Sequence, residues 1–399
     1  MLQTLTLPNI IPFAPHSGSR PVMALAGLLL TTAAMHILSA NTYAVPLDEQ
    51  PKKKTAAEQD PRIGRKVIVT TAGAPLRTPE ATVWEAYLGE TFTISLTNGE
   101  WLWIGEKGGW LFEQHAVMFD DAVEQMSAKI EAEESSENYH LRGVAYLAHG
   151  KYDKSIADLT KSLGIKPDVA NVHNERGKAW YLKAEYGKAI ADFNTAVKVD
   201  PNHFMAFNNR GLAHLATGKL DQARKDLTSA IKHNRKFSEA YNNRGVVNAN
   251  KGDFRAAVND YDSALKIDPA YIEALGNRSF AHRQLGQFER AVADLSTAIR
   301  MKPQDYQPVN DLAWLLATVS DRATRNPAQA VKLATAACQM TGYQDWNTLD
   351  TLAAAHAAAG DFKQAQQWAQ TAVQKAPAAE KAGPQAHLEM FLKKQAISM

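Results

Sequence analysis

The stretch YNNRG at residues 241–245 recurs along the chain at a fixed spacing. The matching stretches are FNNRG at 207–211, HNERG at 173–177, YHLRG at 139–143 and, more loosely, LGNRS at 275–279. Their arginines follow one another every 34 residues, at Arg142, Arg176, Arg210, Arg244 and Arg278. Self-similarity at a period of about 20–50 residues is typical of solenoids, propellers and arrays, and a period of about 34 favours a unit of two helices.

Other positions keep this spacing when each unit is numbered so that its proline stands at position 32, as in Pro167, Pro201, Pro269 and Pro303. Small residues occupy position 8, which holds Gly143, Gly177, Gly211, Gly245 and Ser279, and position 20, which holds Ser155, Ala189, Ala223, Ala257 and Ala291. Position 24 is large and apolar, with Leu159, Phe193, Leu227, Tyr261 and Leu295. This pattern resembles the tetratricopeptide repeat (TPR), which implies a mainly α fold, a right-handed TPR α-solenoid of helical hairpins.

The repeat divides most of the chain. Five regular units fill residues 136–305, namely 136–169, 170–203, 204–237, 238–271 and 272–305. Two irregular units are expected at 306–345 and 346–379, a connecting or capping helix at 119–135, and a C-terminal capping helix at 380–399. Because two helices approach closely only where facing side chains are small, we expect positions 8 and 20 to form the contact inside each hairpin.

A second residue type follows the arginines. Aspartates stand at position 23 of each regular unit, at Asp158, Asp192, Asp226, Asp260 and Asp294. The irregular units lose both residues together, since Leu312 and Leu352 replace the arginine. A half-buried arginine normally has a carboxylate partner, so we predict a structural ladder of Arg–Asp pairs within or between units. The alternative is a basic stripe for an anionic ligand.

The N-terminus predicts export. Residues 21–40 are apolar and uncharged, and small residues flank Tyr43 before a cleavage site after Ala44. We interpret residues 1–44 as a signal peptide, which predicts a periplasmic or secreted protein of the cell envelope. The run is long enough to span a membrane, so an uncleaved N-terminal anchor is the alternative, and the only membrane contact expected. The charged residues 45–61 are expected to form a linker.

Residues 62–118 are expected to form a small all-β domain. The segments 66–72, 91–96, 100–105 and 109–114 are rich in β-branched and aromatic residues. Asn98-Gly99 is a strong hairpin signal. Short strands with a Gly-Trp pair before the last one resemble a bacterial SH3-like barrel. In the families it resembles, an aromatic platform binds peptide or glycan, and Trp101 and Trp103 on one strand face are the candidates. The alternative is ordinary core packing.

Composition and motifs give no sign of catalysis. The net charge of +2 lacks the excess that nucleic-acid binding would require. No phosphate-binding loop, metalloprotease histidine pair or nucleophile elbow occurs, and the single cysteine, Cys338, stands in an apolar helix. We therefore expect no enzyme activity, no cofactor and no metal site.

The first helices carry the candidate site. In the repeat family that the chain resembles, positions 2, 5, 6, 9, 12 and 13 face a concave groove. Asparagines occupy positions 5 and 6 in several units, at Asn174, Asn208, Asn209, Asn242, Asn243 and Asn277. An amide both donates and accepts, so the row is predicted to bind an extended peptide. The alternative is that the amides cap helices or face water. The expected function is an exported scaffold for a protein or peptide partner, and the alternative is an accessory subunit of an envelope enzyme whose β-domain contacts cell-wall glycan.

Overall fold

The computed structural model describes residues 60–105 and 107–398. Two compact units divide the chain between His233 and Asn234. The described residues 60–233 contain a β region followed by helices α1 to α7, and residues 234–398 contain helices α8 to α16. Each unit is considered by itself. The predicted signal peptide (1–44) and almost all of the predicted linker (45–61) lie outside the described residues.

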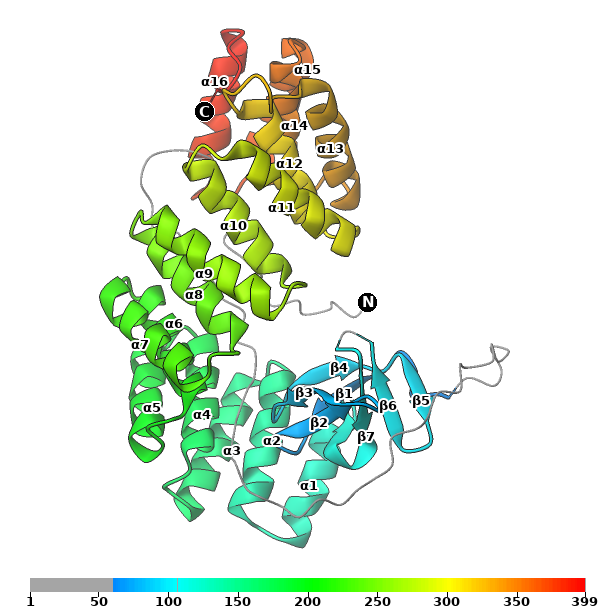
Figure 1. The fold of residues 1–399 in the computed structure, drawn as a ribbon, viewed down its shortest axis with the longest axis vertical. Helices are drawn as coiled ribbons and strands as arrows, with labels where there is room; N and C mark the ends of the chain where they lie inside the picture. Colours follow the sequence, from blue (N-terminus) through cyan, green and yellow to red (C-terminus); the bar gives the residue numbers. More distant parts are fainter. Residues whose placement is uncertain (1–59, 106, 399) are drawn as a thin grey trace. The chain divides into compact units, whose positions relative to one another are not determined.

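The β region consists of two antiparallel sheets (Figure 1). The first has the order β4 (Thr91–Thr93), β1 (Lys66–Val69), β8 (Ala116–Met118). The second has the order β3 (Thr82–Ala86), β2 (Ala74–Arg77), β7 (Gly109–Phe112), β6 (Trp101–Ile104), β5 (Leu96–Asn98). Their inward side chains form one apolar core, which includes Val67, Leu76, Ile94, Leu102 and Leu111.

The sequence found some of these strands and missed others. Asn98-Gly99 joins β5 to β6 with Leu96 opposite Trp103, as the hairpin signal predicts. The segment 91–96 was predicted as one strand, but the chain passes there from one sheet to the other. The amide of Ile94 donates to the carbonyl of Arg65, and the next amide, Ser95, donates to that of Trp103. Strands β2, β3 and β8 were not predicted, and Pro75 weakens the strand signal of β2.

A small cluster connects the β region to the first helices. Ile68 of β1 packs with Ala122 of α1 (Ala122–Ala132) and Ala145 of α2 (Ser136–Ala148). His149, just after α2, bonds through Nε2 to the carbonyl of Phe119 at 2.9 Å, and their rings lie 4.2 Å apart. Apolar packing and a partly buried hydrogen bond thus position the first repeat on the β region.

The repeats form helical hairpins of nearly constant length (Figure 1). In residues 60–233 they are α2 with α3 (Tyr152–Ile165), α4 (Ala170–Leu182) with α5 (Tyr186–Val199), and α6 (Phe204–Ala216) with α7 (Leu220–His233). In residues 234–398 they are α8 (Ser238–Asn250) with α9 (Phe254–Ile267), α10 (Ile272–Gln284) with α11 (Phe288–Met301), α12 (Tyr306–Thr318) with α13 (Pro327–Met340), and α14 (Trp346–Ala358) with α15 (Phe362–Lys375), followed by α16 (Ala382–Leu392).

The turn inside each regular hairpin needs a left-handed residue. Gly150, Gly218, Gly252 and Gly286 have φ between +70° and +79°. Ala184 takes the equivalent place with φ +60°, a conformation that costs an L-residue about 1–2 kcal/mol. The glycine grid of the sequence therefore marks the hairpin turns.

The small residues at position 8 allow the close helix contact with position 20 that the sequence predicted, since Ser279 Oγ donates to the carbonyl of Ala291 at 3.1 Å and a Cβ added at Gly211 would lie 3.3 Å from the carbonyl oxygen of Ala223. A Cβ added at Gly245 would lie 2.5 Å from the ring of Tyr261, and one at Gly177 would lie 2.6 Å from the ring of Phe193. These rings belong to position 24, which the sequence analysis did not include in the contact. The large apolar side chain therefore fills the space that glycine leaves, beside the small residue at position 20.

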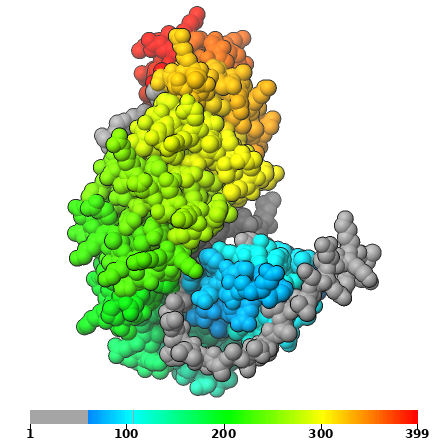
Figure 2. Space-filling model, viewed as in Figure 1, coloured from blue at the N-terminus to red at the C-terminus, as the bar shows by residue number. Residues whose placement is uncertain are grey.

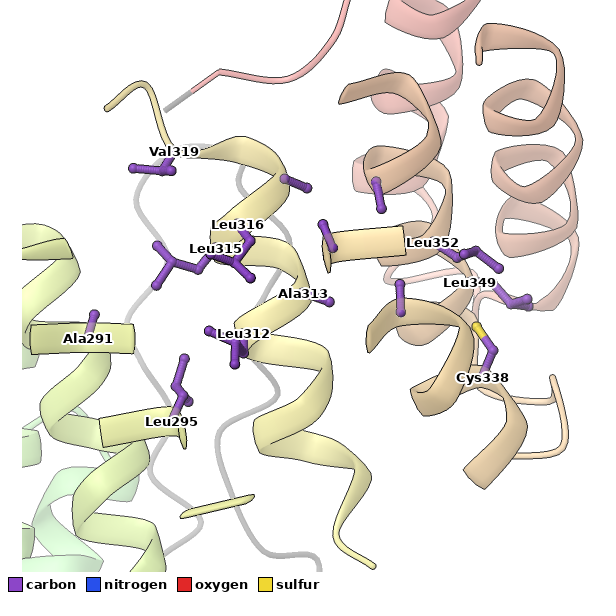
Figure 3. Close-up of a cluster of buried hydrophobic side chains, with 14 of the residues drawn as sticks. Ala291, Leu295, Leu312, Ala313, Leu315, Leu316, Val319, Cys338, Leu349 and Leu352 are labelled. Carbon is purple, nitrogen blue, oxygen red and sulfur yellow. The ribbon is translucent and has the colours of Figure 1, made fainter. Parts of the chain in front are cut away.

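The irregular hairpin α12–α13 keeps its core despite a longer connection. Asn326 caps α13, because its side chain accepts a hydrogen bond from the backbone amide of Gln329. Pro327 is the first residue of the helix. Figure 3 shows Leu312 and Leu315 of α12 facing Leu295 of α11, while Leu349 of α14 and Cys338 of α13 lie together across the same cluster. In Figure 2 the helices α12 to α16 form one continuous surface, yellow to red. Within residues 60–105 and 107–398, no helix is long and apolar enough to cross a membrane.

Candidate binding surface on the first helices

Each arginine at position 7 forms a two-pronged bond with the aspartate of its own hairpin. Arg142 donates from Nε and Nη2 to the two carboxylate oxygens of Asp158, at 2.6 and 2.9 Å. The same arrangement joins Arg176 to Asp192, Arg210 to Asp226, Arg244 to Asp260 and Arg278 to Asp294. The contact that the sequence predicted therefore exists, and it lies within units, between the first and second helix.

The remaining guanidinium nitrogen extends the ladder to the preceding hairpin. Nη1 of Arg176 donates to Thr160 Oγ1 at 3.1 Å, and Nη1 of Arg210 donates to Asn194 Oδ1 at 2.8 Å. Nη1 of Arg278 likewise contacts Asp262 Oδ1 at 2.6 Å. One arginine thus holds three helices together. This second bond was not predicted, although polar residues 16 positions before these three arginines carry the signal.

The aspartates of the ladder are buried, with 4–6% of their surface exposed. Hydrogen bonding to Asp158 raises the pKa of the Arg142 guanidinium, so this cation stays charged. Because removing one partner of a buried ion pair leaves an uncompensated charge, these contacts favour the structural interpretation of the ladder. The stabilising role itself stays a prediction.

The predicted asparagine row is placed on the first helices, but it is not open. Asn174, Asn208, Asn209, Asn242 and Asn243 are only 0–5% exposed. Asn209 Nδ2 donates to Asn174 Oδ1 at 2.9 Å, which links α6 to α4. Asn277 Nδ2, which is half-buried, donates to Asn242 Oδ1 at 2.9 Å and links α10 to α8. Position 6 of one unit therefore bonds to position 5 of the unit before it.

These bonds show that Asn174, Asn209, Asn242 and Asn277 already have hydrogen-bond partners within the protein. These four amides join successive first helices, a role that neither helix capping nor exposure to water describes. The spacing of 35 residues between position 5 and the next position 6 was the available signal. Direct pairing of these residues with a peptide stays a prediction, and it would require the bonds within the protein to exchange.

A buried ion pair on α4 extends the same network. Lys178 Nζ lies 2.9 Å from Glu175 Oε2, and both side chains are at most 1% exposed. The other oxygen of Glu175 accepts from Asn174 Nδ2 at 3.1 Å. Burial acts to lower the pKa of Lys178, and Glu175 opposes this effect. The sequence analysis did not single out this pair, although Glu175 and Lys178 stand at positions 6 and 9, where the other regular units carry neutral residues.

The C-terminal helix takes the same register on the last hairpin. His387 of α16 bonds through Nδ1 to Asp350 Oδ2 at 2.8 Å, and Asp350 occupies position 5 of α14. His387 also packs against Trp314 of α12, with ring centroids 5.5 Å apart. The helix predicted as a cap therefore continues the polar contact between first helices.

The aromatic candidates of the β region share one sheet face. Trp101 lies opposite Phe112, and Trp103 lies opposite Trp110, with ring centroids 5.0 and 5.3 Å apart. The three tryptophans are half-buried, whereas Leu102 and Leu111 on the other face are fully buried. Arg77 of β2 lies beside Trp110 in the ladder. The face is thus partly exposed and aromatic, which suits a platform but does not identify a ligand.

The single cysteine and the buried His140 are both held in their neutral forms. No group of three histidine, cysteine or acidic residues in the described ranges could hold a metal ion. Cys338 is buried, and burial raises the pKa of its thiol to about 11, so the reactive thiolate form is disfavoured. His140 on α2 is held neutral, because burial lowers its pKa to about 4.

Comparison with protein families identifies the repeats. Models described as "Tetratricopeptide repeat" match residues 140–204, 183–229 and 208–272, and a further one matches residues 272–305. The matches cover less than half of the chain. Residues 140–305 are therefore tetratricopeptide repeats, as the periodicity predicted. Among curated proteins no match is found.

Solved structures share the fold at low identity. The Cut9–Hcn1 heterotetramer of the APC/C is 18% identical, with a TM-score of 0.51, over 58% of this chain and 45% of that chain. This chain therefore spans less than half the length of the chain that it matches in that structure. Pseudomonas aeruginosa pilF is 15% identical over 53% of this chain and 94% of that chain, with a TM-score of 0.47. YrrB, titled a TPR protein with an unusual peptide-binding site, is 20% identical over 48% and 98%, with a TM-score of 0.38.

Proposed function

We propose that this chain is an exported, non-catalytic scaffold that binds a protein or peptide partner on the surface of its first helices. The observation that carries the proposal is the tandem array of tetratricopeptide repeats at residues 140–305. Stacked repeats present an extended surface to which each unit contributes one helix. Tetratricopeptide proteins are protein-interaction scaffolds, and the array supplies no competing chemistry.

The geometry supports a pre-organised surface. Arg–Asp pairs fix the second helix of each hairpin to the first, and amide pairs such as Asn209–Asn174 fix neighbouring first helices to each other. A surface whose side chains are already fixed loses less conformational entropy when a partner binds. Contact with the partner is expected at the more accessible first-helix positions, such as Glu137, Asn171 and Glu273 at position 2.

Export is part of the proposal and rests on the sequence of residues 1–44, outside the described ranges. The test is the mass of the N-terminal peptide of protein isolated from the native cells. A mature chain that begins at Val45 supports secretion with cleavage. A chain that retains residues 1–44 in the membrane fraction supports the anchor, and a full-length chain in the cytosol contradicts export.

A second candidate function uses the β region. Its half-buried face of Trp101, Trp103 and Trp110, with Arg77 at its side, favours an aromatic platform. With this face, an SH3-like domain would contact cell-wall glycan or peptide, and the chain would act as an accessory subunit of a cell-envelope enzyme. Retention of the full chain on purified cell-wall sacculi measures this contact. Trp103→Ala should abolish retention if the platform is used, and Trp314→Ala, which alters a buried residue of α12, is the control for folding damage.

The main proposal is tested by affinity capture of the partner from the native envelope on the immobilised full chain. The partner should also bind a variant with Trp101→Ala and Trp103→Ala, because it contacts the repeats. Loss of the partner with this variant would transfer the site to the β region. Failure of any protein to bind the intact chain above a heat-denatured control would contradict the scaffold function.

A further inference from the structure

The amide pairs between first helices do not continue through every unit. Position 5 of one unit and position 6 of the next stand 35 residues apart in the pairs Asn174–Asn209 and Asn242–Asn277. The same register places Gly276 of α10 against Asp311 of α12. A Cβ added at Gly276 would meet nothing within 4 Å, so there is open space at the position where Asn174, Asn208 and Asn242 stand in the three preceding units.

The Asp311 carboxyl lies in surroundings that compensate its charge poorly. Its Oδ1 accepts from Gln307 Nε2 at 3.2 Å, and Asn310 and Arg283 also favour its charged form. Burial is the largest effect and raises the pKa of Asp311 to about 7 in spite of these neighbours. A carboxyl with so high a pKa gains strongly from a further cation or donor at hydrogen-bond distance.

A second acceptor beside Asp311 has no partner. Asn310 is 2% exposed, and among the described residues its Oδ1 accepts no hydrogen bond. In α14, the first helix of the following unit, Thr351 occupies position 6, where Asn209 and Asn277 carry an amide in their units. The Thr351 hydroxyl donates to the carbonyl of Asn347 at 3.0 Å. Leaving a buried carbonyl oxygen without a donor is unfavourable, so this oxygen favours a ligand that donates to it.

An aromatic ring and further negative charge adjoin this place. Phe280 stands one helical turn after Gly276, is half-buried, and already has the Arg283 guanidinium 5.2 Å from its ring centroid. The pKa of Tyr306 is raised, mainly by burial and further by the negative charges of Asp345, Asp305 and Asp311. Aromatic faces attract cations, and the carboxylates give the surroundings a negative potential.

We propose that Gly276, Phe280, Asn310 and Asp311 form a recess that receives a lysine or arginine side chain of the partner. This inference rests on the proposed function and names the chemistry of the ligand at one point of the first-helix surface. The Asp311 carboxylate and Asn310 Oδ1 accept hydrogen bonds from the cationic head, and Phe280 packs against its stem. The glycine provides the room that an asparagine at position 5 would fill.

The experiment uses a library of random 12-residue peptides displayed on phage, selected on the immobilised full chain. We expect the selected peptides to share a lysine or arginine. Replacing that residue by citrulline or norleucine, which remove the charge, should weaken binding tenfold or more. Peptides that bind the repeats equally well after this replacement would overturn the recess and leave the scaffold function intact. A selection that yields no peptide dependent on the repeats would contradict both.

Matched variants locate the contact. Gly276→Asn restores the amide that other units carry, so it should preserve the fold and weaken the basic peptides tenfold or more. Asp311→Asn should have a similar effect, whereas Glu289→Gln, an exposed change on α11, should have none. Asp311→Lys combined with glutamate in place of the peptide's basic residue should restore binding, which a merely structural role of Asp311 would not produce. Unchanged binding by Gly276→Asn would place the basic residue elsewhere.

Discussion

Arg142 donates from Nε and Nη2 to both oxygens of Asp158, a carboxylate that is only 4% exposed. Arg142→Leu should therefore destabilise the protein by about 3–5 kcal/mol, because Asp158 would remain buried without its counter-charge. The double variant Arg142→Leu with Asp158→Leu should regain much of this loss. Urea unfolding of the single and double variants measures both changes. A single variant as stable as the parent would show that the ladder contributes nothing.

The amide of Asn209 gives a second stability test. Asn209→Ala removes the donor to Asn174 Oδ1 and the acceptor of Asn208 Nδ2, which lie in the interior. The loss should amount to about 1–3 kcal/mol, although alanine is the better helix former. Faster hydrogen exchange of the α4 and α6 amides would report it. Unchanged hydrogen exchange would show that the Asn209–Asn174 bond does not stabilise these helices, and ligand contact would remain the one role of the asparagines.

Two glycines at different positions should respond oppositely to alanine. Gly245→Ala brings a methyl group to within 2.5 Å of the Tyr261 ring, and overpacking of this kind costs about 1–3 kcal/mol. Gly276→Ala meets no neighbour and should stabilise its helix by up to about 1 kcal/mol. The measurement is the difference between the two melting temperatures. Equal shifts of both variants would contradict the close contact at position 8.

Asp311 should make stability depend on pH. Its pKa is about 7 in the folded protein, against an ordinary value of 3.8 for an aspartate, so the folded state binds the proton more tightly. Stability contributed by the protonated carboxyl is therefore present at low pH and is lost as pH rises from about 4 through about 7, by at most about 1.4 kcal/mol per pH unit.

The check on Asp311 is a difference curve between the parent and Asp311→Asn. The variant should lose this slope and be the more stable protein at pH 8. The subtraction cancels His140 and His203, whose pKa values burial lowers to about 4 and which act in the opposite direction. The groups around Asp311, namely Arg283, Asp305, Gln307 and Asn310, are retained in both proteins. Parallel curves would show that Asp311 titrates normally.

The repeat architecture could be predicted from sequence because its causes are local and periodic. A glycine at position 8, a left-handed turn at Gly150 or Gly252, and an Arg–Asp pair 16 residues apart all recur in phase. Periodicity also located the asparagines on the first helices. It could not show their burial, because an amide that faces a groove and one that faces the next helix have the same spacing.

Features that occur once escaped the sequence. The sheet change at Ile94 depends on strands far apart in the chain, and the bond between His387 and Asp350 joins residues that no repeat pattern connects. The interruption at Gly276 and Asp311 becomes meaningful only when the neighbouring amide pairs are known. The ligand of the first-helix surface is a property of two molecules, so one sequence does not specify it.

Photo-crosslinking tests the central claim most directly. Benzoylphenylalanine placed at Glu273, on the first helix α10, or at Lys266, on the second helix α9, probes the two sides of neighbouring hairpins in cells that make the protein natively. We predict that the Glu273 probe captures a distinct partner protein and that the exposed Lys266 probe does not. Capture of the same partner from Lys266 alone would contradict binding on the first helices.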